Sequence, residues 1–250
     1  MDAVAWSAVL SETVDAVDRA VRALDGDRRR AVGDRAGQYH LDLIAEAAAL
    51  EVLAPTGARV LSEEAGFVGE GDPTVVMDPV DGSTNFSHGV PHSACSLCVV
   101  DGDGPWVALV VNLATGEKFQ AVRGEGARHD GQAIAGPSGC AELSEALVAV
   151  TGWPGHLGWS QFRAFGAAAL DICNVAAGRI DAFVDPGSHL GVWDYLGALL
   201  VCTESGVAVG ERSGKDLLVL DPSVQRGPVV AATPELRDSL TEALVAVDHP

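Results

Sequence analysis

Apolar positions along the first part of the chain follow helical spacing. From Trp6 to Leu24 they recur every three or four residues, with charged residues on the other faces, which predicts an amphipathic helix that ends at Gly26. A polar, arginine-rich loop is expected up to Gln38, and residues 41–53 then resume helical spacing. The amino-terminal region should therefore contribute two helices, each with an apolar face to bury.

From residue 59 onward the pattern changes to that of short strands. Residues 59–62 and 74–77 are apolar segments of strand length, and Asp78-Pro79 should end the second one because proline cannot donate to a β-ladder. Residues 92–134 contain regularly spaced turn signals and predict a β-meander. Strands and helices then alternate, with strands at 146–150, 180–184 and 229–232 and helices at 161–177, at 192–205 and after the Thr233 cap.

A stretch rich in glycine, proline and serine at residues 136–139 is the best internal boundary. It divides the chain into an amino-terminal α+β half, residues 1–137, and a carboxy-terminal α/β half, residues 138–250. Strands mixed with helices in both halves predict an α/β fold in the broad sense, which includes α+β arrangements.

Composition narrows the classes of function. The chain has 250 residues, 48% of them hydrophobic, which suffices for a sizeable core. Its 16 Lys+Arg against 35 Asp+Glu give a net charge of −19, which argues against binding nucleic acid or an anionic membrane. The first residues lack a signal-peptide pattern and no apolar run is long enough to span a bilayer, so we expect a cytoplasmic protein.

Cysteine usage points the same way. The five cysteines are odd in number and lie mostly in apolar surroundings, as expected for reduced, buried thiols. Cys95-x-x-Cys98 lies within an apolar strand, and no second Cys/His pair has ligand spacing, so a structural role is favoured over a redox or zinc site.

Two short motifs indicate other kinds of protein but lack the necessary context. Gly124-x-Gly126 lacks the third glycine and following helix of a dinucleotide-binding fingerprint, so a hairpin is the better interpretation. The apolar strand before Asp101-x-Asp103 is similar to the start of a haloacid-dehalogenase phosphatase, whose first aspartate is a nucleophile. Because neither lysine has a supporting motif, this stays a second enzyme hypothesis.

The most informative segment carries two closely spaced carboxylates. An apolar strand delivers Asp78 at its end, and Asp81 follows three residues later, with the Val80 carbonyl between them. Oxygen donors at this spacing can converge on a hard cation such as Mg²⁺, and the N–H groups of Gly82 and Ser83 are suited to a phosphate. Taken alone, the motif would favour an ordinary turn followed by a helix cap over a binding site.

Two further acidic positions favour a site. Glu63-Glu64 ends its own strand, and Asp194 starts an apolar helix. Strand ends and helix starts gather on one edge of an α/β sheet, where ligands bind. Glu63, Asp78, Asp81 and Asp194 would then form a cluster too acidic to exist without a counter-cation.

Three motifs together resemble the inositol monophosphatase family. They are residues 61–64 (Leu-Ser-Glu-Glu), residues 78–86 (Asp-Pro-Val-Asp-Gly-Ser-Thr-Asn-Phe) and residues 192–194 (Val-Trp-Asp), and residues 163–183 are similar to the segment before the family's Trp-Asp motif. The resemblance spans residues 40–235. It implies a Mg²⁺-dependent phosphomonoesterase, a layered αβαβα sandwich of the sugar-phosphatase type and a homodimer.

The resemblance also implies roles for individual residues. Two metal ions would share Asp78, the first held by Glu63, Asp78 and the Val80 carbonyl and the second by Asp78, Asp81 and Asp194. Glu63 and the Ser83 hydroxyl would orient the attacking water. The implied substrate-binding residues are Asp81, Gly82, Ser83, Gly166, Ala167, Ala168 and Asp185. His88, His92 and His189 lie near the motifs but are interpreted as non-ligands, because Mg²⁺ prefers oxygen.

Departures from the family pattern leave the substrate open. Ser83 replaces the usual threonine and keeps the hydroxyl, whereas Asp185 stands where inositol-specific members carry glutamate. Residues 33–42 match the family's loop poorly, with only Asp42 aligned, so a third metal ion stays open. The default substrate is myo-inositol 1-phosphate. The alternatives are fructose 1,6-bisphosphate, histidinol phosphate, a 3′-phosphoadenosine phosphate, or a non-catalytic relative that binds a metabolite.

Overall fold

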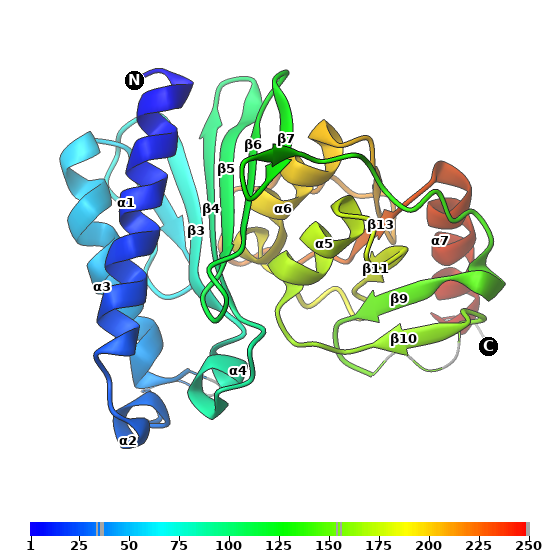
Figure 1. Cartoon of the computed structure of the whole chain (residues 1–250), viewed down its shortest axis with the longest axis horizontal. Helices are drawn as coiled ribbons and strands as arrows, with labels where there is room; N and C mark the ends of the chain where they lie inside the picture. Colours follow the sequence, from blue (N-terminus) through cyan, green and yellow to red (C-terminus); the bar gives the residue numbers. More distant parts are fainter. Residues whose placement is uncertain (34, 36–37, 154, 156, 249–250) are drawn as a thin grey trace.

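Five layers of secondary structure stack along the long axis of the molecule (Figure 1). The computed structural model describes residues 1–33, 35, 38–153, 155 and 157–248. The layers are a helical layer, an eight-stranded sheet, a second helical layer, a five-stranded sheet and a terminal helix. This arrangement confirms the expected αβαβα sandwich. No helix in the described ranges is long and apolar enough to cross a bilayer.

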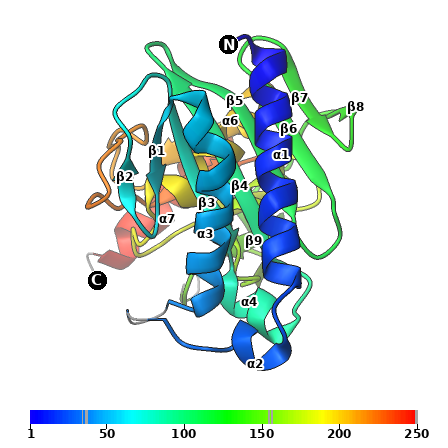
Figure 2. The same cartoon turned by 90° about the vertical axis from the view of Figure 1, so that its left-hand side faces the viewer.

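The first layer consists of α1 (Ala3–Arg22) and α3 (His40–Leu53), which lie side by side on the outer face of the first sheet (Figure 2). The Asp2 side chain accepts a hydrogen bond from the Ala5 N–H at 2.8 Å and caps α1. Its predicted apolar face, from Trp6 to Val21, is buried. The expected loop after it contains a short helix, α2 (Gly26–Arg29), which the spacing did not predict.

The first sheet has the strand order β2-β1-β3-β4-β5-β6-β7-β8. Its strands are β1 (Arg59–Ser62), β2 (Gly66–Val68), β3 (Thr74–Asp81), β4 (Ala94–Asp101), β5 (Gly104–Asn112), β6 (Lys118–Val122), β7 (Gly126–His129) and β8 (Gln132–Ala133). The pair β1–β3 is parallel and the pair β3–β4 is antiparallel. The strands from β4 to β8 form the β-meander predicted over residues 92–134.

The expectation that β3 ends at Asp78-Pro79 is wrong. The strand continues to Asp81, and its register against β4 shifts between Asp78 and Asp81, an irregularity that accommodates a residue without an N–H. In β4, Cys95 and Cys98 are buried and free, and they belong to the hydrophobic clusters on opposite faces of the sheet. The two thiols are therefore structural, as predicted.

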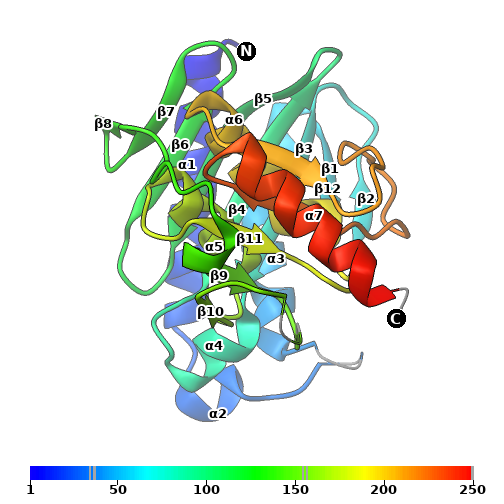
Figure 3. The same cartoon turned by 90° about the vertical axis from the view of Figure 1, so that its right-hand side faces the viewer.

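The second sheet has the order β10-β9-β11-β13-β12. Its strands are β9 (Leu147–Val150), β10 (Gln161–Arg163), β11 (Ala182–Val184), β12 (Ala208–Glu211) and β13 (Pro228–Ala231), with the 3₁₀ turn η2 (Leu143–Glu145) before β9. The final helix, α7 (Pro234–Asp248), packs on its outer face (Figure 3). All strands of the first sheet precede residue 137 and all strands of the second follow residue 138. The two-domain division itself stays a prediction.

The middle layer consists of α5 (Ala168–Ala176) and α6 (Val192–Glu204), which carry the largest buried apolar cluster. The helix predicted over residues 161–177 is wrong at its start, because residues 161–163 form β10 and Gly166 has a φ of +86°. In α6, a Cβ on Gly197 would lie 3.1 Å from the Leu97 carbonyl oxygen. This close approach fixes the middle of α6 against the first sheet.

Candidate active site

Three carboxylates from two elements converge where β3 ends. Asp78 and Asp81 lie among the last four residues of β3, and Asp194 lies in the first turn of α6. One oxygen of each lies within 4.8 Å of the others. Asp78 and Asp81 are only 3% and 7% exposed. The structure thus brings together three of the four acidic residues that the sequence assigned to one cluster.

Backbone N–H groups hold each of the three carboxylates. The Val80 N–H donates to Asp78 Oδ1 at 2.9 Å, and the Gly191 N–H donates to Asp194 Oδ2 at 2.6 Å. Asp81 accepts from two N–H groups at the start of α5, those of Ala168 at 3.3 Å and Ala169 at 2.7 Å. In the described part of the chain, no salt bridge involves any of the three.

Burial without a cationic partner perturbs the acidity of the whole group. Burial raises the pKa of Asp81 to about 7 and holds the pKa values of Asp78 and Asp194 well above the usual range, and the neighbouring carboxylates raise them further. Such a set of oxygen donors suits a hard divalent cation, which would compensate the repulsion between the carboxylates. The residues present therefore fit the metal ions that the sequence predicted.

Glu63 reaches the same region from a different element. It follows β1 in the turn to β2, and its side chain is more exposed than those of the three aspartates. Burial raises its pKa to about 7, and Glu64 and Asp42 add to the effect. Its negative charge raises the pKa values of Asp78 and Asp194, as expected for a neighbour of the cluster, although Glu63 lies outside the 4.8 Å group.

Asp42 completes the acidic surroundings of Glu63. It lies in the first turn of α3, where Oδ2 accepts from the Tyr39 N–H at 2.8 Å and buried Oδ1 has no hydrogen-bond partner in the described chain. Burial raises its pKa to about 7. The preceding loop, on which the question of a third metal ion depends, includes Asp34, Ala36 and Gly37, which lie outside the described residues.

The predicted phosphate-binding residues connect β3 to a short helix, α4 (Ser83–His88). Val80 is buried, and Gly82 adopts a φ of +81° that places Ser83 at the first position of α4. A Cβ on Gly82 would lie 2.7 Å from the Gly166 carbonyl oxygen, so only glycine allows this approach. The structure thereby places Gly82 against Gly166, although 84 positions separate them in the sequence.

Gly166, Ala167 and Ala168 form the segment that enters α5 next to Asp81. Asp185 differs from these in its surroundings. It is fully buried, and its oxygens accept from the Gly187 N–H at 3.0 Å and the His189 N–H at 2.6 Å. Its role as a substrate contact stays a prediction.

Histidines near the motifs pair with other carboxylates. His92 Nε2 lies 2.8 Å from Asp171 Oδ1, and His189 Nδ1 lies 3.1 Å from Asp185 Oδ1. Neither belongs to the group formed by Asp78, Asp81 and Asp194. Sequence reasoning missed Asp171, because nothing in the local pattern distinguishes it from an ordinary polar residue of α5.

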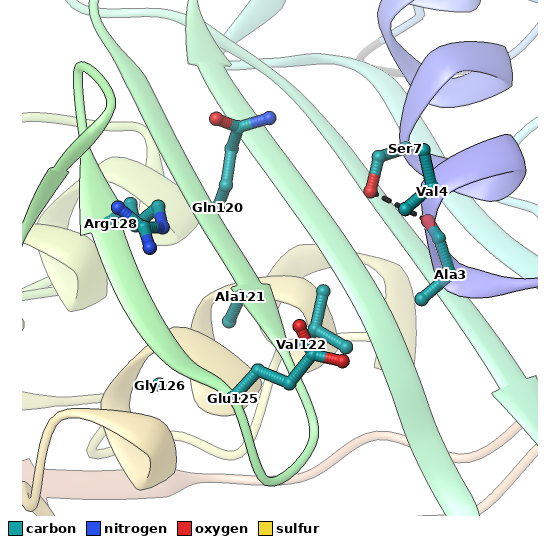
Figure 4. A pocket seen from close by; sticks show the side chains of 9 residues that line it. All are labelled: Ala3, Val4, Ser7, Gln120, Ala121, Val122, Glu125, Gly126 and Arg128. Atoms are coloured by element: carbon teal, nitrogen blue, oxygen red, sulfur yellow. Dashed lines mark hydrogen bonds between the residues drawn. The ribbon is translucent and has the colours of Figure 1, made fainter.

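A separate pocket is lined by residues of α1 and of the β6–β7 hairpin, elements that lie at the opposite end of the first sheet from α4 (Figure 1). It has a volume of about 240 Å³ and lies between the start of α1 and the β6–β7 hairpin (Figure 4). Gln120, Glu125 and Arg128 are the longest of its polar lining side chains. Glu125 is its single carboxylate, so it offers no cluster of metal ligands.

The fold and site define a class of protein, and comparison with known proteins agrees with it. The profile of the inositol monophosphatase family matches residues 38–249, and the chain belongs to that family. A protein from Archaeoglobus fulgidus named fructose-1,6-bisphosphatase/inositol-1-monophosphatase is 34% identical over 214 residues, which cover 81% of this chain and 82% of the relative.

Other relatives carry different names. Nus factor SuhB from Escherichia coli is 32% identical over 228 residues, which cover 82% of this chain and 84% of the relative. Among solved structures, a Pyrococcus horikoshii protein described as similar to inositol-1 monophosphatase has a TM-score of 0.88 at 24% identity, over 97% of this chain and 99% of that chain. This last likeness shows the fold alone.

Proposed function

We propose that the protein is a Mg²⁺-dependent phosphomonoesterase that hydrolyses a small phosphorylated metabolite, with myo-inositol 1-phosphate as the first candidate. The observation that carries the proposal is the convergence of Asp78, Asp81 and Asp194 within 4.8 Å, with no salt bridge to any of them among the described residues. Membership of the family and the phosphatase names of relatives such as the Archaeoglobus fulgidus protein support it.

The metal ligands in this proposal are Glu63, Asp78, the Val80 carbonyl, Asp81 and Asp194. When bound, Mg²⁺ supplies positive charge for the phosphate and lowers the pKa of water. Backbone N–H groups of Gly82 and Ser83 bind phosphate oxygens.

Glu63 is proposed to orient the attacking water. It lies beside Asp78 and Asp194, so the residue that would hold the metal ion is also placed to direct the water. The Ser83 hydroxyl would orient that water. No covalent intermediate is required.

Substrate selection is assigned to Gly166, Ala167, Ala168 and Asp185. The first three lie beside Gly82, so they are placed to contact the alcohol portion of a phosphate ester held there. Their small side chains leave recognition largely to backbone groups. Fructose 1,6-bisphosphate, histidinol phosphate and 3′-phosphoadenosine phosphate remain alternatives with the same chemistry.

The decisive experiment measures phosphate release from these four substrates with Mg²⁺ and with EDTA. We expect release by the wild type only with Mg²⁺, and its loss in Asp78→Asn, which keeps the shape of the side chain. Asp103→Asn, in the exposed β4–β5 turn, is the matched control and should retain activity. Metal-independent release, or full activity of Asp78→Asn, would refute the proposal. Tight metabolite binding without turnover would instead favour a non-catalytic family relative.

A further inference from the structure

The Asn85 side chain joins two segments that are far apart in sequence. Its Nδ2 group donates to the His92 carbonyl oxygen at 2.7 Å and to the Phe165 carbonyl oxygen at 2.6 Å. Both partners are acceptors, so a single nitrogen with two hydrogens is needed to bridge them. Among uncharged side chains, only the amides of asparagine and glutamine provide this group.

The bridge contacts the start of the 166–168 segment, which is assigned to the substrate's alcohol. Phe165 immediately precedes Gly166, and a Cβ on Gly166 would lie 3.2 Å from Asn85 Nδ2. On the other side, a Cβ on Gly82 would lie 2.7 Å from the Gly166 carbonyl oxygen. Asn85 therefore fixes the point where the phosphate-binding turn and the alcohol-binding segment touch.

Neighbouring contacts make the bridge rigid. The imidazole of His92 lies 2.8 Å from Asp171 of α5 and packs at 5.0 Å, between ring centroids, against Phe165. The main-chain oxygen of Asn85 also accepts from the Val90 N–H at 2.9 Å, which ties the end of α4 to its start. Asn85 is thus held at its main chain and at its Nδ2 group, so its side chain has little freedom to move and the position of α4 determines the position of Phe165.

From this geometry we infer that Asn85 is a positioning residue that sets the spacing between the phosphate-binding turn and the 166–168 segment, and thereby determines which alcohols are accepted. The inference rests on the proposed function. Asp81 already links the same segment to β3 through the Ala168 and Ala169 N–H groups. Asn85 adds a second attachment of this segment at Phe165, and two attachments fix the orientation of the segment where one would allow it to rotate.

The test compares substrates that differ only in what the alcohol offers. We would measure kcat/KM for the most active polyol or sugar phosphate of the panel and for p-nitrophenyl phosphate, whose leaving group carries no hydroxyl to recognise. In Asn85→Ala, the ratio of the two values should fall about tenfold or more, since small misplacements of positioning groups have effects of this order. The loss should come mainly from KM for the polyol or sugar phosphate, with the Mg²⁺ activation constant unchanged.

Two further variants complete the design. Asn85→Ser retains one donor and should give an intermediate ratio. Asn174→Ala also removes a hydrogen-bonding asparagine, whose Oδ1 accepts from Arg179 at 3.1 Å, and should leave the ratio at the wild-type value. A purely structural role for Asn85 would lower the unfolding temperature and both kcat/KM values equally.

The outcomes separate the two proposals. An active wild type with an unchanged ratio in Asn85→Ala, equal losses on both substrates, or failure of both Asn85 variants to fold would overturn the positioning role alone. A wild type inactive on every phosphate ester refutes the proposed function, and the role of Asn85 falls with it.

Discussion

Replacing Asp81 by asparagine should stabilise the metal-free protein at pH 8 but not at pH 5. Burial raises the pKa of Asp81 from 3.8 to about 7, so an ionised Asp81 costs the folded protein about 4 kcal/mol. Asparagine removes this penalty but accepts only one of the two hydrogen bonds from Ala168 and Ala169, a loss of about 1–2 kcal/mol. The variant should therefore be more stable at pH 8 by about 2–3 kcal/mol.

The sign of the pH dependence follows from proton binding. Between about pH 4 and pH 7 the folded protein retains a proton on Asp81 that the unfolded chain has released, so wild-type stability falls as the pH rises through this interval. At pH 5 the penalty has fallen to about 2 kcal/mol, which is similar to the cost of the lost hydrogen bond. Wild type and variant should then be about equally stable.

Thermal unfolding in EDTA at the two pH values provides the assay. For a chain of this size, each kcal/mol shifts the midpoint by about 2–4 °C, so Asp81→Asn should unfold about 5–10 °C higher at pH 8. Adding Mg²⁺ at about 100 times its Kd should stabilise the wild type by about 2.7 kcal/mol and the variant by less. An equal difference between the two proteins at pH 5 and pH 8 in EDTA would show that Asp81 carries no such penalty. Asp103→Asn should change neither midpoint.

Three further predictions concern the rest of the fold. Glu204→Ala removes the acceptor of the Gly124 and Gly126 N–H groups, each at 2.9 Å, and should lower the free energy of unfolding by about 1–2 kcal/mol in a denaturant titration without affecting turnover. Cys140, the one partly exposed thiol of the five, should react first with Ellman's reagent, while the other four react only on unfolding. Trp6→Ala, at a side chain that is 2% exposed, should cost about 3–5 kcal/mol by the same titration, and a loss below 1 kcal/mol would contradict its place in the core.

The sequence pattern predicted those elements in which buried and exposed positions alternate regularly or turn residues mark the ends. The apolar face from Trp6 to Val21 follows directly from helical periodicity, and the meander follows from its turn residues. The start of α5 could not be predicted in this way. Residues 161–163 have a composition that suits either state, and pairing with β9 decides in favour of a strand. The predicted end of β3 at Pro79 was wrong for a related reason. Pairing with the neighbouring strand β4 decides the outcome, and a register shift in that pairing accommodates the proline.

The candidate site shows the same division. Asp78, Asp81 and Asp194 could be placed together from sequence because a strand end and a helix start meet at one edge of a sheet. The contacts of Asn85 with Phe165 and of His92 with Asp171 span about 80 positions and depend on how α5 docks. Helical and strand periodicity relate only residues that are close in sequence, so these two contacts could be identified only from the structure.

The position of α6 between the two sheets has a consequence for how the protein matures during synthesis. Asp194 is the last of the proposed metal ligands to emerge from the ribosome, long after Asp78 and Asp81, and the helix that carries it must find its place against both sheets. A nascent chain that has completed the first sheet would already hold two of the three convergent carboxylates but no closed site. High-affinity metal binding would thus report that both halves of the chain have assembled, and a pulse-labelled nascent chain should acquire it only after β13, which ends at Ala231, has left the ribosome.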